Sequence, residues 1–76
     1  MNETSIRIYP NPVKSVLNIE GLESGSLEIY GLTGSLLLKE KFRKQLDISH
    51  LGTGIYYLIA RNQAGQPIVT QRIIKH

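Results

Sequence analysis

The stretch LGTGIYYL at residues 51–58 decides the fold class. It has the form Leu-x-x-Gly-x-Tyr at the start of a late strand, which is where a small antiparallel β-sandwich carries its tyrosine corner. In such a corner the phenol of Tyr56 donates a hydrogen bond to backbone a few residues upstream, and Gly54 supplies the open backbone needed at the bend. We therefore assign Leu51, Gly54 and Tyr56 to a structural corner.

Outward from this stretch, apolar and polar residues alternate with a period of two, which is typical of half-buried strands. Turn signals rich in glycine separate the strands every eight to twelve residues, and one of them ends at Gly34. We expect strands at residues 5–9, 15–20, 26–31, 35–42, 45–48, 55–62 and 66–75. Residues 36–44 contain good helix formers but no convincing N-cap, so a strand is favoured there. The pattern predicts an all-β, antiparallel sandwich of about seven short strands.

Two of the expected strands are apolar on both sides. In the strand at 55–62, Tyr56, Leu58 and Ala60 share one face and three further apolar residues share the other, so we expect it to be central and buried on both sides. The strand that ends the chain, Ile68 to Lys75, also contributes apolar side chains to both of its faces.

Length and composition limit the possible functions. A chain of 76 residues forms one domain and buries only roughly 60% of its unfolded surface. It contains no cysteine, which excludes disulfides and thiolate metal sites, and its formal charge of +3 permits an acidic partner without requiring one. The start MNETSIRIYP has no apolar leader, and Met1 followed by polar residues suggests a start placed on a fragment of a longer protein.

The sequence predicts no catalytic, cofactor-binding or metal site. Glu20 and Glu28 could face each other on neighbouring strands, but a carboxylate pair on a solvent face is usually only solvated. Asp47, Ser49 and His50 include the residue types of a hydrolytic triad, yet four consecutive positions cannot easily provide the required geometry. Two histidines without cysteine make a zinc site improbable, and the glycine runs match no phosphate-binding loop.

A basic run contains Lys39, Lys41, Arg43 and Lys44. These side chains could bind phosphates on one face of a hairpin. The alternative, which we favour, is an edge strand kept soluble by its charges. Nucleic acid is therefore not an expected partner.

The segment Tyr9-Pro10-Asn11-Pro12 places two prolines between β-like runs. Proline fixes φ and has no N–H, and it pushes the residue before it towards extended geometry. We therefore expect a rigid, extended ramp at this point.

The order of these elements resembles, over nearly the whole chain, the type A C-terminal sorting domain of the bacterial type IX (Por) secretion system. The resemblance is carried by the motifs Tyr9-Pro10-Asn11-Pro12, Glu28-Ile29-Tyr30 with Gly34, Leu51-x-x-Gly54-x-Tyr56 and Arg72-Ile73-Ile74-Lys75. Thr33 stands where the family often has asparagine, and Arg72 where it often has lysine.

This resemblance implies an immunoglobulin-like sandwich at the end of a larger secreted protein, with residues 6–76 as the sorting domain and residues 1–5 as the remnant of a cleavable linker. Such domains are not enzymes and use no cofactor. The type IX translocon and its shuttle components recognise them, and a surface sortase-like peptidase then removes them from the passenger, which lies N-terminal to residue 1. The passenger reaches the cell surface or the medium through the periplasm and outer membrane, so the domain's association with that membrane is indirect.

The resemblance also implies which residues carry the signal: Tyr9, Pro10, Asn11, Pro12, Arg72, Ile73, Ile74 and Lys75. We expect Arg72 and Lys75 to be surface charges that contribute little to stability. The alternative function is an immunoglobulin-like structural or glycan-binding module, for which only Tyr30 and Tyr57 are plausible outward-facing rings in this tryptophan-free chain.

Overall fold

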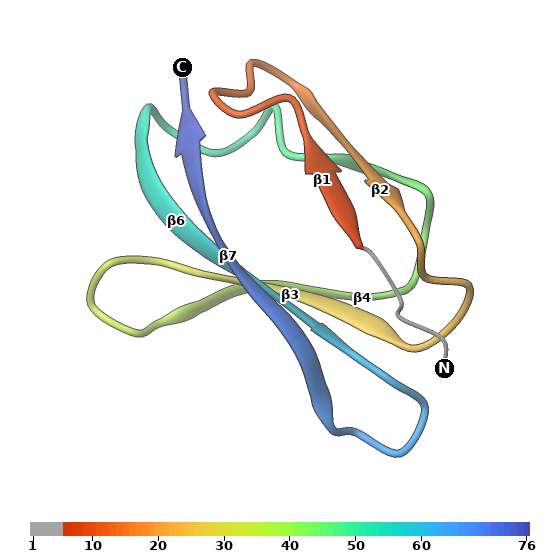
Figure 1. The fold of residues 1–76 in the computed structure, drawn as a ribbon. Coiled ribbons are helices and arrows are strands. Elements are labelled where there is room, and N and C mark those ends of the chain that lie inside the picture. The colour runs from red at the N-terminus through yellow and green to blue at the C-terminus, as the bar shows by residue number, and fades with distance from the viewer. Residues whose placement is uncertain (1–5) are drawn as a thin grey trace.

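The computed structural model describes residues 6–76, and its regular elements are seven strands (Figure 1). They are β1 (Arg7–Tyr9), β2 (Val16–Glu20), β3 (Ser26–Tyr30), β4 (Leu36–Lys41), β5 (Gln45–Asp47), β6 (Gly54–Arg61) and β7 (Pro67–Lys75). Every strand begins and ends within two residues of its predicted bounds. The choice of strand over helix for residues 36–44 is confirmed by β4.

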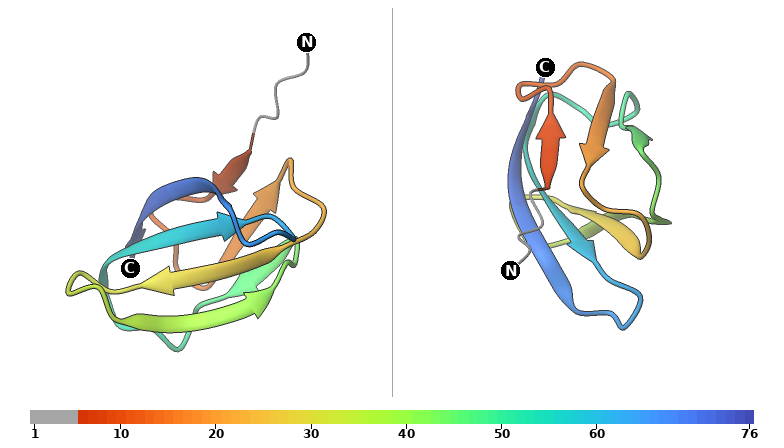
Figure 2. Two further views of the ribbon diagram at one scale, coloured as in Figure 1. Left: turned by 90° about the horizontal axis from the view of Figure 1, so that it is seen from below. Right: turned by 45° about the vertical axis from the view of Figure 1, so that its right-hand side comes forward.

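The strands form two sheets, and all paired strands in them are antiparallel. One sheet has the order β1-β2-β5 and the other β4-β3-β6-β7. Figure 2 shows the two sheets as separate layers, with β1 and β2 behind the four-stranded sheet in its left view. This arrangement confirms the predicted all-β, immunoglobulin-like sandwich. Within residues 6–76 no helix is long and apolar enough to cross a membrane.

The hydrophobic core lies between the sheets and takes side chains from both. Its fully buried members are Val13, Leu17, Ile19, Leu27, Ile29, Leu46, Ile48, Leu58, Ala60 and Ile73. Most of them alternate along their strands with more exposed residues, as a two-layer fold requires. This alternation of buried and exposed residues explains the period of two in the sequence.

The prediction that β6 is buried on both sides is wrong. The strand is central in its sheet, between β3 and β7. Leu58 and Ala60 face the core, but Ile55 and Tyr57 on the opposite side remain 37% and 36% exposed. A sandwich of two layers covers only one face of each sheet, so apolar residues on the outer face stay in contact with water.

The extended ramp predicted at Tyr9–Pro12 is also wrong. The chain bends at Asn11 and Pro12, and the peptide bonds before both prolines are cis. The bend carries the chain from β1, in the three-stranded sheet, to Val13, which forms a parallel bridge with Lys75 of β7 in the other sheet. A straight segment would have continued along the first sheet.

Two glycines occupy positions that constrain the turns. Gly34, in the turn between β3 and β4, has φ +88° and donates its N–H to the Gly31 carbonyl at 3.0 Å. Gly25, before β3, has φ +110°, and a Cβ there would lie 1.9 Å from the carbonyl oxygen of Arg61. Gly25 therefore permits a close backbone approach between the start of β3 and the end of β6.

Candidate functional site

The two motifs assigned to the signal, Tyr9–Pro12 and Arg72–Lys75, lie side by side in the structure. The Asn11 amide nitrogen donates to the Arg72 carbonyl at 2.8 Å. Its amide oxygen accepts from the Ile74 N–H at 2.9 Å. One side chain thus offers a donor and an acceptor to the outer edge of β7, as the backbone of a neighbouring strand would.

Val13 continues this pairing with its backbone. The Val13 N–H donates to the Ile74 carbonyl, and the His76 N–H donates to the Val13 carbonyl, both at 2.8 Å. The Val13 side chain is fully buried, which anchors the segment in the core. We call Asn11 and Val13, with their four hydrogen bonds to residues 72–76, the clip.

The prolines explain why the clip needs an asparagine side chain. Neither Pro10 nor Pro12 has an N–H, so the segment between β1 and Val13 is poor in backbone donors. Asn11 stands between them and supplies both polar groups. The sequence did not predict that the two motifs meet. The one sequence feature that pointed to this contact is a single asparagine between two prolines, which have no backbone N–H to donate.

The motif on β7 is divided between two faces. Ile73 is fully buried and Lys75 is only 6% exposed, whereas Arg72 lies at the surface and Ile74 is half-buried. The expectation that Lys75 is a surface charge is wrong: its ammonium donates to the His76 carbonyl at 2.8 Å. Lys75 alternates with Arg72 and Ile74 along β7 and shares the inward side with Ile73, so its stem is covered by the fold.

Tyr9 is fixed on the three-stranded sheet. Its hydroxyl donates to Glu20 at 2.5 Å, and the Arg7 guanidinium lies over its ring at 5.3 Å while pairing with Glu20 at 3.3 Å. The hydrogen bond to Glu20 raises the pKa of the Tyr9 phenol. These interactions hold an exposed ring in one orientation just before the clip.

The residues of the predicted corner lie together at the start of β6. The Tyr56 hydroxyl donates to the Gly52 carbonyl four residues upstream at 2.7 Å. Leu51 packs against the core, and Gly54 begins the strand. The corner holds the crossover between the sheets and takes no part in the clip.

Glu20 and Glu28 are not neighbours, because β2 and β3 belong to different sheets. Glu28 is buried in β3, where it pairs with Arg61 at 3.0 Å and accepts from the Tyr30 hydroxyl at 2.9 Å. Burial acts to raise the pKa of Glu28, but the hydrogen bonds from Arg61 and Tyr30 outweigh it and hold this pKa below its ordinary value. Glu28 is therefore a structural carboxylate that remains ionised.

Asp47 and the basic run, which were also considered from the sequence, make contacts that stabilise a turn and an edge strand. Asp47 accepts from the Ser49 N–H at 2.8 Å, which lowers the pKa of Asp47 and closes the turn after β5. In the basic run, Arg43 pairs with Glu40 at 3.3 Å and β4 forms an edge of its sheet, as the favoured interpretation predicted. Among residues 6–76 no group of three histidine, aspartate or glutamate side chains is placed to hold a metal.

Comparison with known families matches residues 7–76 to the model of the secretion system C-terminal sorting domain. The chain belongs to this family. It is also 33% identical over 70 residues to a protein named Beta-agarase D from Zobellia galactanivorans. That match covers 91% of this chain and 14% of the relative, so the sorting domain spans a small part of the relative's length. No solved structure matches the chain.

Membership of this family defines what the sorting domain does. It is a signal that directs a passenger protein through the Por, or type IX, system for secretion across the outer membrane, and it is not a catalyst.

Proposed function

We propose that this chain is a type A sorting domain whose motifs Tyr9–Pro12 and Arg72–Lys75 form a single recognition surface for the type IX translocon and its shuttle components. The observation that supports this proposal is the pair of hydrogen bonds between Asn11 and β7. They join positions that lie 61 and 63 residues apart in the sequence. A receptor that contacts one motif would therefore also meet the other.

The proposed roles within this surface follow from burial. Arg72 and Tyr9 are exposed, and Ile74 shares the outward side of β7 with Arg72, so these side chains contact the receptor. Asn11, Ile73 and Lys75 act indirectly, because they hold β7 in place. Pro10 and Pro12 shape the bend.

The clip also limits how β7 is recognised. A partner strand could not pair with the edge of β7 at Arg72 and Ile74. The Arg72 carbonyl and the Ile74 N–H and carbonyl already form hydrogen bonds with Asn11 and Val13. Strand addition is therefore restricted to the part of β7 before Arg72, where the residues that the structure describes provide no second neighbouring strand. In this proposal the receptor recognises the side chains of the motif Arg72–Lys75 and not its backbone groups.

The remaining steps concern the passenger. In this proposal it precedes residue 1, residues 1–5 are the remnant of a cleavable linker, and residues 6–76 are the sorting domain. Residues 1–5 lie outside the residues that the structure describes. A surface sortase-like peptidase cuts upstream of the folded body, and the passenger is left at the cell surface or in the medium. A peptidase requires an accessible segment, whereas a receptor requires a fixed surface.

Fusion of residues 1–76 to the C-terminus of a periplasmic reporter tests this function. In a type IX-competent bacterium we expect the reporter at the cell surface, and in an isogenic strain without the translocon we expect it in the periplasm. Periplasmic retention in both strains would contradict the sorting function. That result would favour the alternative structural or glycan-binding module.

A further inference from the structure

The two outer faces of the sandwich differ in chemistry. On the three-stranded sheet polar side chains bond to one another: Gln45 donates to Asn18 at 3.2 Å, and Tyr9 donates to Glu20. On the four-stranded sheet Tyr30 and Arg61 also bond to Glu28, but apolar side chains stand beside this cluster. We call five side chains of this face the outer patch: Tyr30 of β3, Ile55, Tyr57 and Ile59 of β6, and Ile74 of β7.

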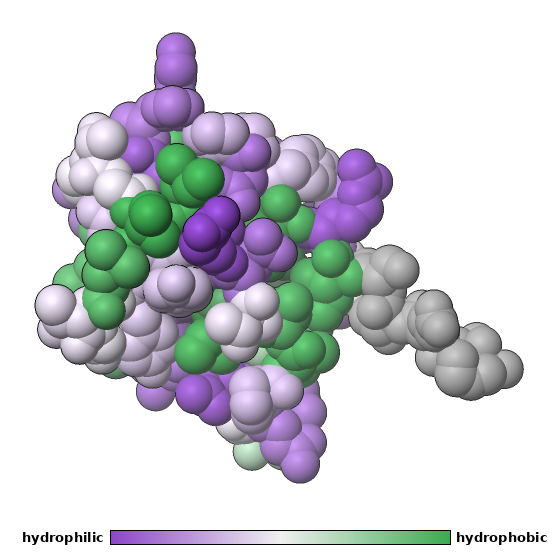
Figure 3. Space-filling view, turned by 60° about the vertical axis from the view of Figure 1, so that its left-hand side comes forward, coloured by the Kyte–Doolittle hydropathy of each residue, from purple (hydrophilic) through white to green (hydrophobic). Residues whose placement is uncertain are grey.

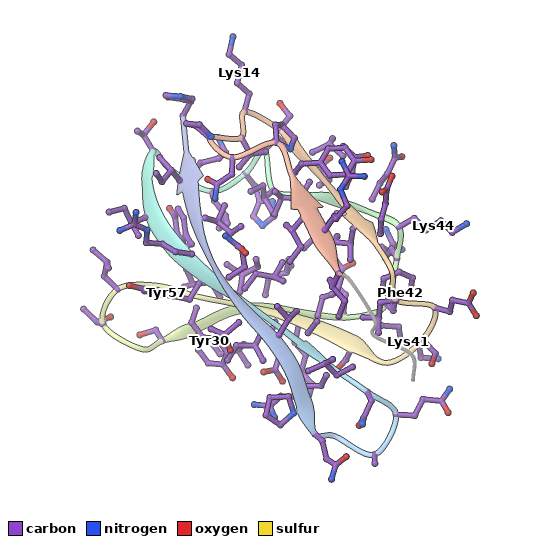
Figure 4. All side chains as sticks on the ribbon, in the orientation of Figure 1. Lys14, Tyr30, Lys41, Phe42, Lys44 and Tyr57 are labelled. Atoms are coloured by element: carbon purple, nitrogen blue, oxygen red, sulfur yellow. The ribbon has the colours of Figure 1, made fainter. Side chains whose placement is uncertain are left out.

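Strand register places the patch residues next to one another. Tyr57 is paired with Tyr30 on one side and Arg72 on the other, and Ile55 is paired with Ile74. Figure 4 shows Tyr30 and Tyr57 on the side of their sheet that is turned away from β1 and β2. Figure 3 shows hydrophobic side chains beside strongly hydrophilic ones on the surface that faces left in Figure 1.

The fold does not require this apolar surface. Alternate residues of the same strands, including Leu27, Ile29, Leu58 and Ile73, already fill the core. Tyr57 remains 36% exposed and Ile55 37%. Covering such exposed apolar side chains with a partner's apolar side chains is favourable.

Charges around the outer patch are mainly positive. Arg72 is in register with Tyr57, Lys39 with Glu28, and Lys41 with Ser26. Glu28 is already paired with Arg61, whereas Arg72, Lys39 and Lys41 form no salt bridge with any residue from 6 to 76. A partner that supplies carboxylates beside apolar side chains would complement this face.

We propose that the outer patch and its basic rim are a docking face for another protein whose surface combines apolar side chains with carboxylates. A second copy of this chain does not fit, because its cations would face those of the first. An anionic membrane would also be attracted to this basic rim, and an adduct with lipid in the experiment below identifies that case.

The size of the patch indicates a transient complex. Strand spacing and rise give it an area of roughly 200 Å², compared with about 800 Å² per partner in a stable interface. The patch would thus be the apolar centre of a modest interface. This inference does not depend on whether the partner belongs to the secretion machinery.

A photo-crosslinking amino acid at Tyr57, in the full-length protein expressed in its own cells, tests the proposal. The matched control carries the same group at Val16, which is also 37% exposed but lies on the three-stranded sheet. We expect a discrete adduct from position 57 and not from position 16, with the crosslinked site beside aspartate or glutamate. Lys39→Glu should reduce its yield at least tenfold, and replacement of the partner's carboxylate by lysine should restore it.

Other outcomes overturn the proposal. They are an adduct with a second copy of the chain, an adduct with lipid, equal yields from positions 57 and 16, and a protein adduct that is insensitive to Lys39→Glu. The patch and its rim share Ile74 and Arg72 with the proposed recognition surface, so normal surface delivery without the expected adduct would overturn this proposal alone. Surface delivery of the same protein provides that separate measurement.

Discussion

At the scale of single residues, the contribution of the Tyr56 hydroxyl to stability depends on whether its acceptor is exposed to water. If its acceptor were buried, loss of the bond would leave that acceptor unsatisfied at a cost of about 1–3 kcal/mol. Gly52 is exposed, so water can replace the lost donor. The bond therefore contributes no more than an ordinary net hydrogen bond.

We expect Tyr56→Phe to lower the free energy of unfolding by about 0.5–1.5 kcal/mol, the net value of one hydrogen bond. Tyr57→Phe is the matched control in the same strand, because the Tyr57 hydroxyl makes no hydrogen bond to the residues that the structure describes, and its effect should be near zero. Urea denaturation of both variants measures the difference. Equal stability of the two variants would show that the corner bond does not contribute.

Glu28 makes stability depend on pH. Its pKa is below the ordinary value in the folded chain, so the carboxylate stabilises the fold above its unfolded pKa of about 4.3. That contribution is lost as pH falls through the lower, folded pKa. We expect Glu28→Gln to be less stable than the wild type at pH 7, with the difference shrinking towards zero in more acidic solution.

Thermal melting of the wild type and Glu28→Gln at a series of pH values tests this expectation. The lowered pKa of Asp47 affects both proteins in the same way and cancels in the comparison. Glu20→Gln, which alters an exposed carboxylate, serves as the control. A difference that stays constant from neutral to acidic pH would show that the Glu28 charge is not what stabilises the fold.

Gly25 and Gly34 separate two reasons for glycine in a turn. Gly25→Ala should cost more than about 2 kcal/mol, because its Cβ would overlap the backbone oxygen of Arg61. Gly34→Ala meets nothing within 4 Å, so only its positive φ costs energy, about 1–2 kcal/mol. Denaturant midpoints of both variants give this order, and a reversed order would contradict the close approach at Gly25.

At the scale of elements, the clip joins the segment after β1 to the last strand. β7 pairs along its inner edge with β6, and its final residues pair along the outer edge with Asn11 and Val13. The end of the chain is therefore held on both edges, although terminal strands often fray. Residues 72–76 therefore have a fixed conformation.

Asn11→Ala removes both side-chain bonds of the clip. We expect a loss of about 1–3 kcal/mol in the free energy of unfolding and faster hydrogen exchange at the Ile74 amide, whose acceptor is the Asn11 oxygen. Asn18→Ala is the control, because the Asn18 side chain bonds to Tyr9 and Gln45 of the three-stranded sheet. Unchanged protection of the Ile74 amide in Asn11→Ala would show that the clip is open in solution.

At the scale of the whole molecule, local patterns predicted the strands and missed the contacts between distant segments. The period of two and the turn residues give seven strands to within two residues, since both are properties of neighbouring positions. The pairing of Asn11 with β7 joins positions more than sixty residues apart and has no local signature. Lys75 was expected at the surface because charged residues near a terminus are usually exposed. The outer side of β6 was expected to be buried, because periodicity does not show which face of a strand another layer covers.

The packing of β7 determines which variants can test the proposed signal at Arg72–Lys75. Deletion of Arg72–His76 would remove Ile73 from the core and break the clip, so loss of secretion could result from unfolding alone. Arg72→Ala removes only an exposed side chain, and its cost in stability should be within about 0.5 kcal/mol. Thr70→Ala, on the same outward side of β7, is the matched control.

The role proposed for Arg72 is tested by the fraction of a fused reporter that reaches the cell surface when its sorting domain carries Arg72→Ala. We predict a lower surface fraction and a larger periplasmic amount than for the wild type, with Thr70→Ala delivered normally and all three isolated domains melting at similar temperatures. Delivery of Arg72→Ala equal to the wild type would contradict the claim that the outward face of the clipped strand is what the translocon reads.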